Sequence, residues 1–223
     1  MALFRSRTDE SAESHEQSSD DNSLTRRILR AWAPVLVPLA VMWVLQIINA
    51  VTGYALSNAA GIQPRSLEGL VGIVAAPVLH FSFSHLLSNT VPWIILGTLL
   101  AVITRKYGQV TLQIWLISGV ITWLIGGSNS VHTGASGVIY GYAAFLMIYG
   151  ILVRKFWAML ISVITIIGYA GLVWGLFPQA GVSWQGHLGG VIAGIVAALT
   201  LTKDIRAERK ALKEAKQARR IVS

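Results

Sequence analysis

The sequence predicts an all-α polytopic membrane protein, a bundle of six transmembrane helices with both termini in the cytoplasm. Its 223 residues are 54% hydrophobic and only 13% charged, whereas a soluble domain carries about a quarter charged residues. The charges also lie near the ends of the chain, because residues 34–202 contain only six of them. A run of about 20 uncharged apolar residues crosses a bilayer as a helix, since an open strand would leave its backbone groups unpaired in lipid.

The chain is predicted to have three parts: an N-terminal tail, a membrane domain that contains six apolar runs, and a C-terminal helix. Residues 1–33 are rich in serine and acidic side chains and end in a basic segment, which is typical of a disordered cytoplasmic tail and not of a signal peptide. Residues 34–202 form the membrane domain. Residues 203–223 are predicted to form a basic cytoplasmic helix that lies at, or projects from, anionic headgroups. The predicted spans are residues 34–56, 85–103, 110–125, 136–153, 156–177 and 187–202.

The basic residues predict the orientation. All 18 lysines and arginines except Arg65 lie in the terminal segments or in the loops after spans two and four. Because cytoplasmic loops carry the excess of basic residues, both termini are expected inside. The same distribution accounts for the net charge of +8 without nucleic-acid binding. The chain has no cysteine, which excludes a disulfide, a thiol nucleophile and a cysteine metal site.

Four polar side chains near the outer ends of three spans are candidate site residues. His85 and Asn89 open span two, Ser136 opens span four and His187 opens span six. At about 1.5 Å per residue, each lies roughly 24–30 Å from the first cytoplasmic basic residue of its span, so all four share one level slightly below the outer surface. Polar groups at that depth are costly and mark function. Packing, interfacial anchoring or interhelical hydrogen bonding explains each residue alone, but not their common level.

Stripes of small residues predict which spans pack together. Glycines at every fourth position let helix backbones approach closely. If the stripes of spans four and six meet, Ser136 and His187 come near hydrogen-bonding distance, and the ring of Tyr140, one turn below Ser136, supports the imidazole. The glycines are Gly137 and Gly141 in span four, and Gly186, Gly190 and Gly194 in span six.

Three motifs, in this order, resemble those of the rhomboid family of intramembrane serine proteases, in its bacterial six-span form. "HFSFSHLLSN" (residues 80–89) is similar to the family's second-span motif of histidines and an asparagine. "GASG" (residues 134–137) resembles its nucleophile motif, and "GHLGGVIAG" (residues 186–194) resembles its histidine-bearing last span. The likeness covers residues 34–202. It departs from the family in the first outer loop, where many rhomboids carry a Trp-Arg pair and this chain has only Arg65.

The resemblance implies a serine endopeptidase that cleaves transmembrane segments of membrane proteins near the outer face. Ser136 would be the nucleophile, and His187 its general base and then the acid for the leaving amine. His85 and Asn89, with the Ser136 backbone N–H, would form the oxyanion hole. No Asp or Glu lies within a predicted span, which favours a Ser-His dyad over a triad.

Further expectations follow from the resemblance. Tyr140, Gly134 and Gly137 would support the site, and His80 would line a water-filled entrance. The implied partners are transmembrane protein substrates and the lipid bilayer, with no cofactor, metal or nucleic acid. The implied location is the bacterial inner membrane, with the site opening to the extracytoplasmic side. Candidates to hold the catalytic water, by polarity alone, are Ser128, Asn129, Ser130 and His132.

Two other classes of protein stay open. A catalytically inactive relative would bind membrane proteins without cutting them, but such relatives usually lose the nucleophile or the base, and this chain keeps both. A zinc site is the other, because histidine clusters bind zinc. Against a zinc site, the chain has no H-E-x-x-H motif and offers no acidic ligand. The histidines expected on the outer side are His80, His85, His132 and His187.

Overall fold

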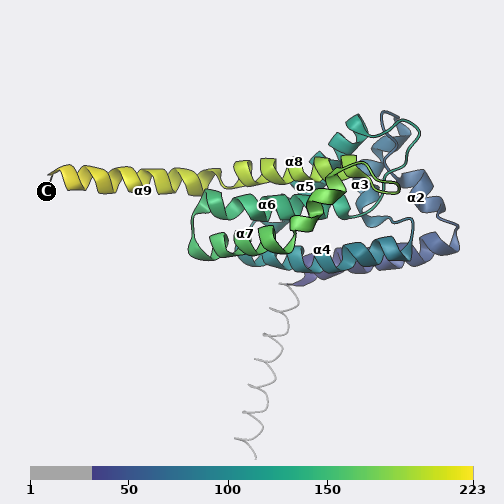
Figure 1. Cartoon of the computed structure of the whole chain (residues 1–223), viewed down its shortest axis with the longest axis horizontal. Coiled ribbons are helices and arrows are strands. Elements are labelled where there is room, and N and C mark those ends of the chain that lie inside the picture. The colour runs from purple at the N-terminus through teal and green to yellow at the C-terminus, as the bar shows by residue number, and fades with distance from the viewer. Residues whose placement is uncertain (1–31, 223) are drawn as a thin grey trace, which may run out of the picture.

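The computed structural model describes residues 32–222. Within that range the secondary structure is helical, apart from one isolated antiparallel bridge between Ile62 and His132 (Figure 1). This confirms the predicted all-α polytopic class. The tail predicted to be disordered falls almost wholly on residues 1–31, which lie outside the described residues.

Five described helices are long and apolar enough to cross a membrane, and a sixth span is formed if one bent pair is counted as a unit. The bent pair is α7 (Phe156–Gly168) with the 3₁₀ helix η3 (Ala170–Leu176), and its two halves meet at 57°. The five straight helices are Trp32–Val51, α4 (Phe83–Ile103), α5 (Tyr107–Ile125), α6 (Ser136–Val153) and α8 (Trp184–Leu201).

Most spans begin and end within about three residues of the sequence-based expectation, but two differ more. The first helix ends at Val51 and not at residue 56, because Gly53 and Tyr54 take positive φ angles of 63° and reverse the chain. The reversed chain forms the separate short helix α2 (Ala55–Ala60). The fifth span, expected to be continuous, breaks after Gly168, where glycines weaken the helix. The first outer loop carries three short helices, η1 (Glu68–Leu70), α3 (Gly72–Ala75) and η2 (Ala76–Val78).

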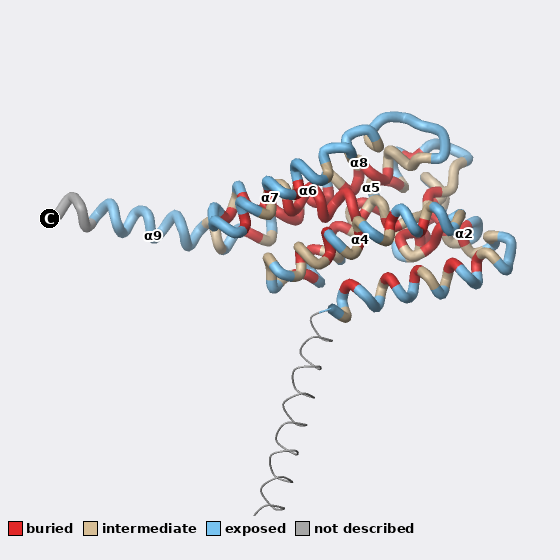
Figure 2. The backbone as a smooth tube through the Cα atoms, turned by 60° about the horizontal axis from the view of Figure 1, so that its bottom comes forward, coloured by how far each residue is buried: buried red, intermediate tan, exposed pale blue. Residues whose placement is uncertain are grey.

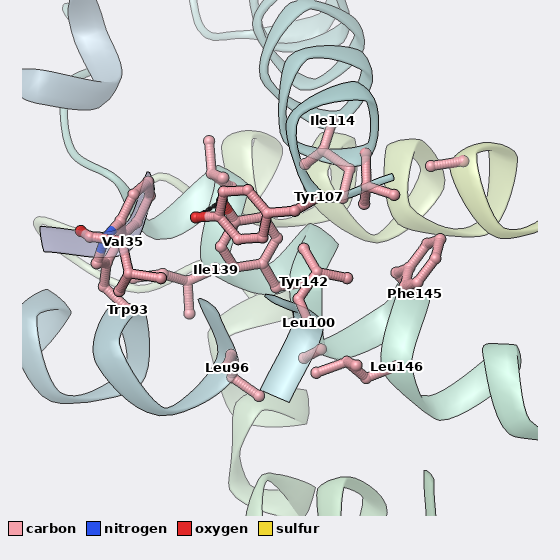
Figure 3. Packing of buried hydrophobic residues seen from close by; sticks show 14 of the residues in the cluster. Val35, Trp93, Leu96, Leu100, Tyr107, Ile114, Ile139, Tyr142, Phe145 and Leu146 are labelled. Atoms are coloured by element: carbon pink, nitrogen blue, oxygen red, sulfur yellow. Dashed lines mark hydrogen bonds between the residues drawn. The ribbon is translucent and has the colours of Figure 1, made fainter. Parts of the chain in front are cut away.

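Helix α6 is the centre of the bundle. It contacts α4, α5, α7 and α8, and Figure 2 shows its backbone as the most continuously buried. Figure 3 shows how residues of the first helix, α4 and α5 pack around its Tyr142, Phe145 and Leu146. An apolar helix that neighbours cover on all sides meets little lipid. The helix that begins at Ser136 is therefore the most firmly held element of the fold.

The glycine stripes of α6 and α8 face each other. A Cβ added to Gly190 would overlap the carbonyl oxygen of Gly137, and one added to Gly194 would overlap that of Gly141. A Cβ on Gly137 would lie 3.1 Å from the Gly186 carbonyl oxygen. The two backbones are thus in direct contact along the stripe, which places the first turns of α6 and α8 side by side.

The chain enters and leaves the bundle at the same end. The Tyr107 hydroxyl donates to the Pro34 carbonyl at 3.3 Å, and the neighbouring Lys106 ammonium donates to the Leu201 carbonyl at 3.0 Å. Helix α9 (Lys203–Val222) then extends away from the bundle, with residues 207–218 exposed (Figure 1). Both ends of the membrane domain therefore lie on one side, while the cytoplasmic identity of that side stays a prediction.

Candidate functional site

A serine and a histidine from two different helices are hydrogen-bonded at the other end of the bundle. Ser136 is the first residue of α6, and His187 lies in the first turn of α8. The Oγ of Ser136 is 2.9 Å from the Nε2 of His187. The Nδ1 of His187 is 2.7 Å from the Gly175 carbonyl oxygen of η3. A carbonyl only accepts, so Nδ1 carries the proton and Nε2 is left to accept from the Ser136 hydroxyl.

The end of η3 makes this arrangement possible. In a continuous α-helix the Gly175 carbonyl would accept from the backbone four residues later. Here η3 ends at Leu176, and the Gly175 carbonyl is available to the imidazole. The Leu172 carbonyl accepts the Tyr140 hydroxyl at 2.8 Å, and the Tyr140 ring stacks on His187 with centroids 4.0 Å apart. The imidazole is therefore held by its edge and by its face.

His85 and Asn89 approach the same place from α4. The His85 ring packs on the Gly134 backbone, since a Cβ added there would lie 2.7 Å from its Cε1. Gly134 has φ 112°, so a glycine is needed for the conformation as well as for the space. The Nδ2 of Asn89 is buried and finds no acceptor among the described residues. A buried donor without a partner is destabilising, and it is also what an anionic reaction intermediate requires.

A cavity of about 580 Å³ opens at this pair. Ser136, His187, His85 and Asn89 all line it, so the structure brings the four predicted site residues together at one level. Other lining residues come from the start of α4, the loop before α6 and the loop before α8. Those that carry polar side chains are Ser82, Ser88, Ser130, His132, Thr133 and Ser183.

His80 differs from its expectation. It was expected to line a water-filled entrance, but its side chain is fully buried and takes no part in the cavity wall. Its Nε2 accepts the backbone N–H of Ala135 at 3.4 Å, directly before Ser136. Burial, and secondarily the neighbouring His85, lowers the pKa of His80 to about 3. His80 is therefore neutral, as an acceptor nitrogen requires, and it supports the turn that begins α6.

Three buried polar side chains donate hydrogen bonds to the His80 carbonyl oxygen, and the sequence did not predict this cluster. Asn49 Nδ2 donates to that carbonyl at 2.8 Å, and the Ser57 hydroxyl donates to it at 3.1 Å. With its amide nitrogen turned toward the same oxygen, Gln46 donates at 2.8 Å. All three side chains are at most 1% exposed. The signal was present, because Gln46 and Asn49 are strongly polar residues inside an apolar span.

Arg65 holds the first outer loop in place without a tryptophan beside it. Its left-handed backbone, with φ 59°, turns the side chain toward the end of α5. There Nη1 donates to the carbonyls of Leu124 at 2.9 Å and Gly126 at 2.7 Å. The indole of Trp123 donates back to the Ser66 carbonyl at 2.9 Å. The side chains of Arg65 and Trp123 thus join the first outer loop to the end of α5 from both sides.

Of the four residues considered as holders of the catalytic water, two line the cavity and two do not. Ser130 and His132 line the cavity, while Ser128 accepts from Arg65 Nη2 at 2.7 Å. Asn129 has φ 64° and shapes the loop. Among the described residues, no group of three or more His, Asp or Glu side chains is arranged to hold a metal ion.

The fold and the site together define a polytopic membrane protein with a hydrogen-bonded serine–histidine pair between two close-packed helices. A family model of the Rhomboid domain matches residues 68–204. Uncharacterized proteins of Mycobacterium tuberculosis and Mycobacterium bovis are each 39% identical over 191 residues, covering 81% of this chain and 79% of the relative. One of Mycobacterium leprae is 39% identical over 191 residues, covering 81% of this chain and 75% of its own. The chain belongs to the rhomboid family.

Proposed function

We propose that this protein is an intramembrane serine endopeptidase that cleaves transmembrane segments of other membrane proteins with a Ser136–His187 dyad. The observation that carries the proposal is the 2.9 Å contact between Ser136 Oγ and His187 Nε2, with the histidine tautomer set by Gly175. Family membership supports the same class of chemistry. The alternative, a factor that binds membrane proteins without cutting them, has no need of a serine–histidine pair with this geometry.

In the proposed reaction the Ser136 oxygen attacks the scissile carbonyl carbon while its proton passes to His187 Nε2. The carbonyl π bond opens, and the resulting oxyanion is held by Asn89 Nδ2, His85 and the Ser136 N–H. His187 then returns the proton to the leaving amine as the C–N bond breaks. A water attacks the acyl-serine by the same route, which releases the second product and restores the hydroxyl.

The Gly175 carbonyl takes the orienting role that a carboxylate has in a triad. It keeps the proton on Nδ1, so that Nε2 faces Ser136. A neutral carbonyl stabilises the imidazolium less than a full negative charge at the same distance. The stacked Tyr140 ring adds support, because a cation over an aromatic face is attracted to it. We infer a dyad held by η3, which fits a membrane interior where a buried carboxylate would be costly.

The proposed site opens toward the extracytoplasmic side of a bacterial inner membrane. Basic residues lie at the ends of the helices that are far from Ser136, and such residues stay in the cytoplasm. They are Arg105 and Lys106, between α4 and α5, and Arg154 and Lys155, between α6 and α7. A peptide bond in a substrate helix is hydrogen-bonded along its own backbone, so it must unwind before Ser136 reaches it. Substrates are therefore transmembrane segments with weak helix formers near their outer ends.

The decisive experiment is labelling with a fluorophosphonate probe, which reacts with an activated serine. The wild type should be labelled, and Ser136→Ala and His187→Ala should not, because groups that act as a unit lose nearly everything together. Ser88→Ala is the matched control, since this serine lines the same cavity with its hydroxyl bonded to the His85 carbonyl at 2.8 Å. Equal labelling of Ser136→Ala and wild type would refute the assignment.

A further inference from the structure

His132 is a buried histidine beside the dyad that the proposed mechanism does not use. It lies in the loop between α5 and α6, four residues before Ser136, and is 9% exposed. Its Nδ1 is 2.6 Å from the Ser183 hydroxyl and its Nε2 is 2.8 Å from the Ser130 hydroxyl. Its backbone exchanges two hydrogen bonds with Ile62, each of 2.9 Å. The backbone is therefore bonded to the first outer loop, and the ring to its own loop and to the start of α8.

The neighbours of the ring determine where its proton lies. The Ser130 hydroxyl donates to the Gly127 carbonyl at 2.6 Å, which uses its only proton. Ser130 Oγ must then accept from a protonated Nε2 of His132. In the neutral ring Nδ1 is consequently bare, and it accepts the proton of the Ser183 hydroxyl. Burial lowers the pKa of His132, which favours this neutral form.

Ser183 is the residue through which His132 reaches the dyad. It is the N-cap of α8, and its hydroxyl oxygen accepts from the Gly186 N–H at 3.3 Å. Its carbonyl accepts the backbone N–H of His187 at 3.1 Å. A cap residue satisfies the free N–H groups of the first turn and sets where the helix begins. The first turn of α8 carries the imidazole that bonds Ser136, so the rotamer of Ser183 bears on that imidazole.

We propose that His132 is a positioning residue for the Ser136–His187 dyad, and that it acts by accepting the Ser183 hydroxyl on Nδ1. The inference rests on the proposed function. His132 touches neither reacting atom, but it lines the same cavity and fixes the cap of the helix that carries the base. Without this acceptor, the Ser183 hydroxyl rotates toward other partners and caps α8 less well. The first turn of α8, which carries His187, is then held less firmly.

Two amide substitutions of His132 test the roles of its two ring nitrogens separately. Asparagine places its carbonyl oxygen near the position of Nδ1, so His132→Asn keeps an acceptor for Ser183 but does not reach Ser130. Glutamine is longer, so His132→Gln keeps a donor near the position of Nε2 but loses the acceptor for Ser183. The fluorophosphonate labelling rate of detergent-solubilised full-length protein should fall about tenfold in His132→Gln, the value of one hydrogen bond. His132→Asn should retain most of the wild-type rate.

The loss should appear in the maximal labelling rate and not in the probe concentration at half-saturation, because both variants keep a polar side chain at this place in the cavity wall. Ser183→Ala should lose at least as much as His132→Gln, because it also removes the acceptor of the Gly186 N–H. The double variant should lose no more than Ser183→Ala alone, since both single variants remove the hydrogen bond between His132 and Ser183. Equal rates for the asparagine and glutamine variants, or additive losses in the double variant, would overturn the role of Nδ1.

Thermal unfolding of each variant shows whether it is folded. If neither histidine variant folds, Ser183→Ala and Ser183→Thr carry the test, because threonine keeps the hydroxyl. A threonine variant as slow as the alanine variant overturns the proposal. A folded wild type that is not labelled at Ser136 refutes the proposed function itself, which is a different result from labelled variants that all react alike.

Discussion

Gly190→Ala tests, with one methyl group, how the serine and the histidine are brought together. Gly190 lies one turn after His187, and it faces Gly137, the residue after Ser136. The new Cβ would overlap the Gly137 carbonyl oxygen, and it would lie 2.9 Å from the Gly137 carbonyl carbon and 3.1 Å from Tyr140 Cβ. These neighbours are backbone or Cβ atoms, and none of them can rotate away. The helices α6 and α8 must therefore separate.

The expected loss follows from the size of that separation. About 1 Å is needed before the methyl group and the carbonyl oxygen reach a tolerable distance. A shift of that size near His187 would stretch its 2.9 Å contact with Ser136 beyond hydrogen-bonding range. A misplacement of about 1 Å costs on the order of 10²-fold in rate. Helix propensity acts in the opposite direction, since alanine favours a helix by about 1 kcal/mol over glycine.

The assay is the rate of fluorophosphonate labelling in detergent, together with cleavage of a transmembrane substrate. Gly190→Ala should be slowed about 100-fold in labelling, with its helix content unchanged. Gly108→Ala in α5 is the matched control, because a Cβ there meets nothing within 4 Å. It should react at the wild-type rate. If Gly190→Ala also reacts at the wild-type rate, close packing of the two glycine stripes does not control the geometry of the dyad.

The remaining predictions concern the oxyanion, acid stability and the cleaved bond. Asn89→Ala should slow labelling and cleavage on the order of 10²-fold while leaving both measurable, because other donors remain; unchanged rates would make Asn89 a packing residue. Acid should destabilise the protein, because the pKa of His80 is about 3 when folded against an ordinary 6.5, so the unfolded chain binds the extra proton as pH falls below 6.5. At pH ~5 the loss is on the order of 2 kcal/mol relative to neutral pH, and thermal unfolding of His80→Gln should show a smaller loss; an equal loss in that variant would exclude His80 as the cause. Mass spectrometry of the products should place the cut near the outer end of a substrate helix, next to Gly, Pro or other weak helix formers, which lower the unwinding cost by about 1–3 kcal/mol per residue. A cut at the cytoplasmic end would contradict the assigned site or the orientation.

Much of the fold could be predicted from the sequence because bilayers impose simple rules on composition. Uncharged apolar runs must be helices, so the number of spans and most of their bounds followed from hydropathy. The pairing of α6 with α8 was also accessible, because glycines at every fourth position mark close backbone contact. Ser136 and His187 could be connected for the same reason, since each begins one of these helices.

Other features had a signal that only the structure explained. Gln46 and Asn49 stood out as strongly polar residues in an apolar span, but nothing in the sequence said that both would bond the His80 carbonyl. His80 itself was expected at a water-filled entrance, and its burial overturned that expectation. A residue's position in a motif predicts that it matters, whereas the direction of its side chain depends on neighbours that come from other helices.

The sequence by itself determined the membrane class, the spans and the identity of the pair that meets. Only the tertiary structure decided how that pair is oriented. The Gly175 carbonyl that bonds His187 belongs to the backbone, and a backbone carbonyl has no signature in the sequence. It is available because η3 ends at Leu176, and its position follows from the 57° bend between α7 and η3. Hydropathy reports whether a segment prefers lipid, but the break, the free carbonyl and its partner arise from how α6, α8 and η3 pack against one another.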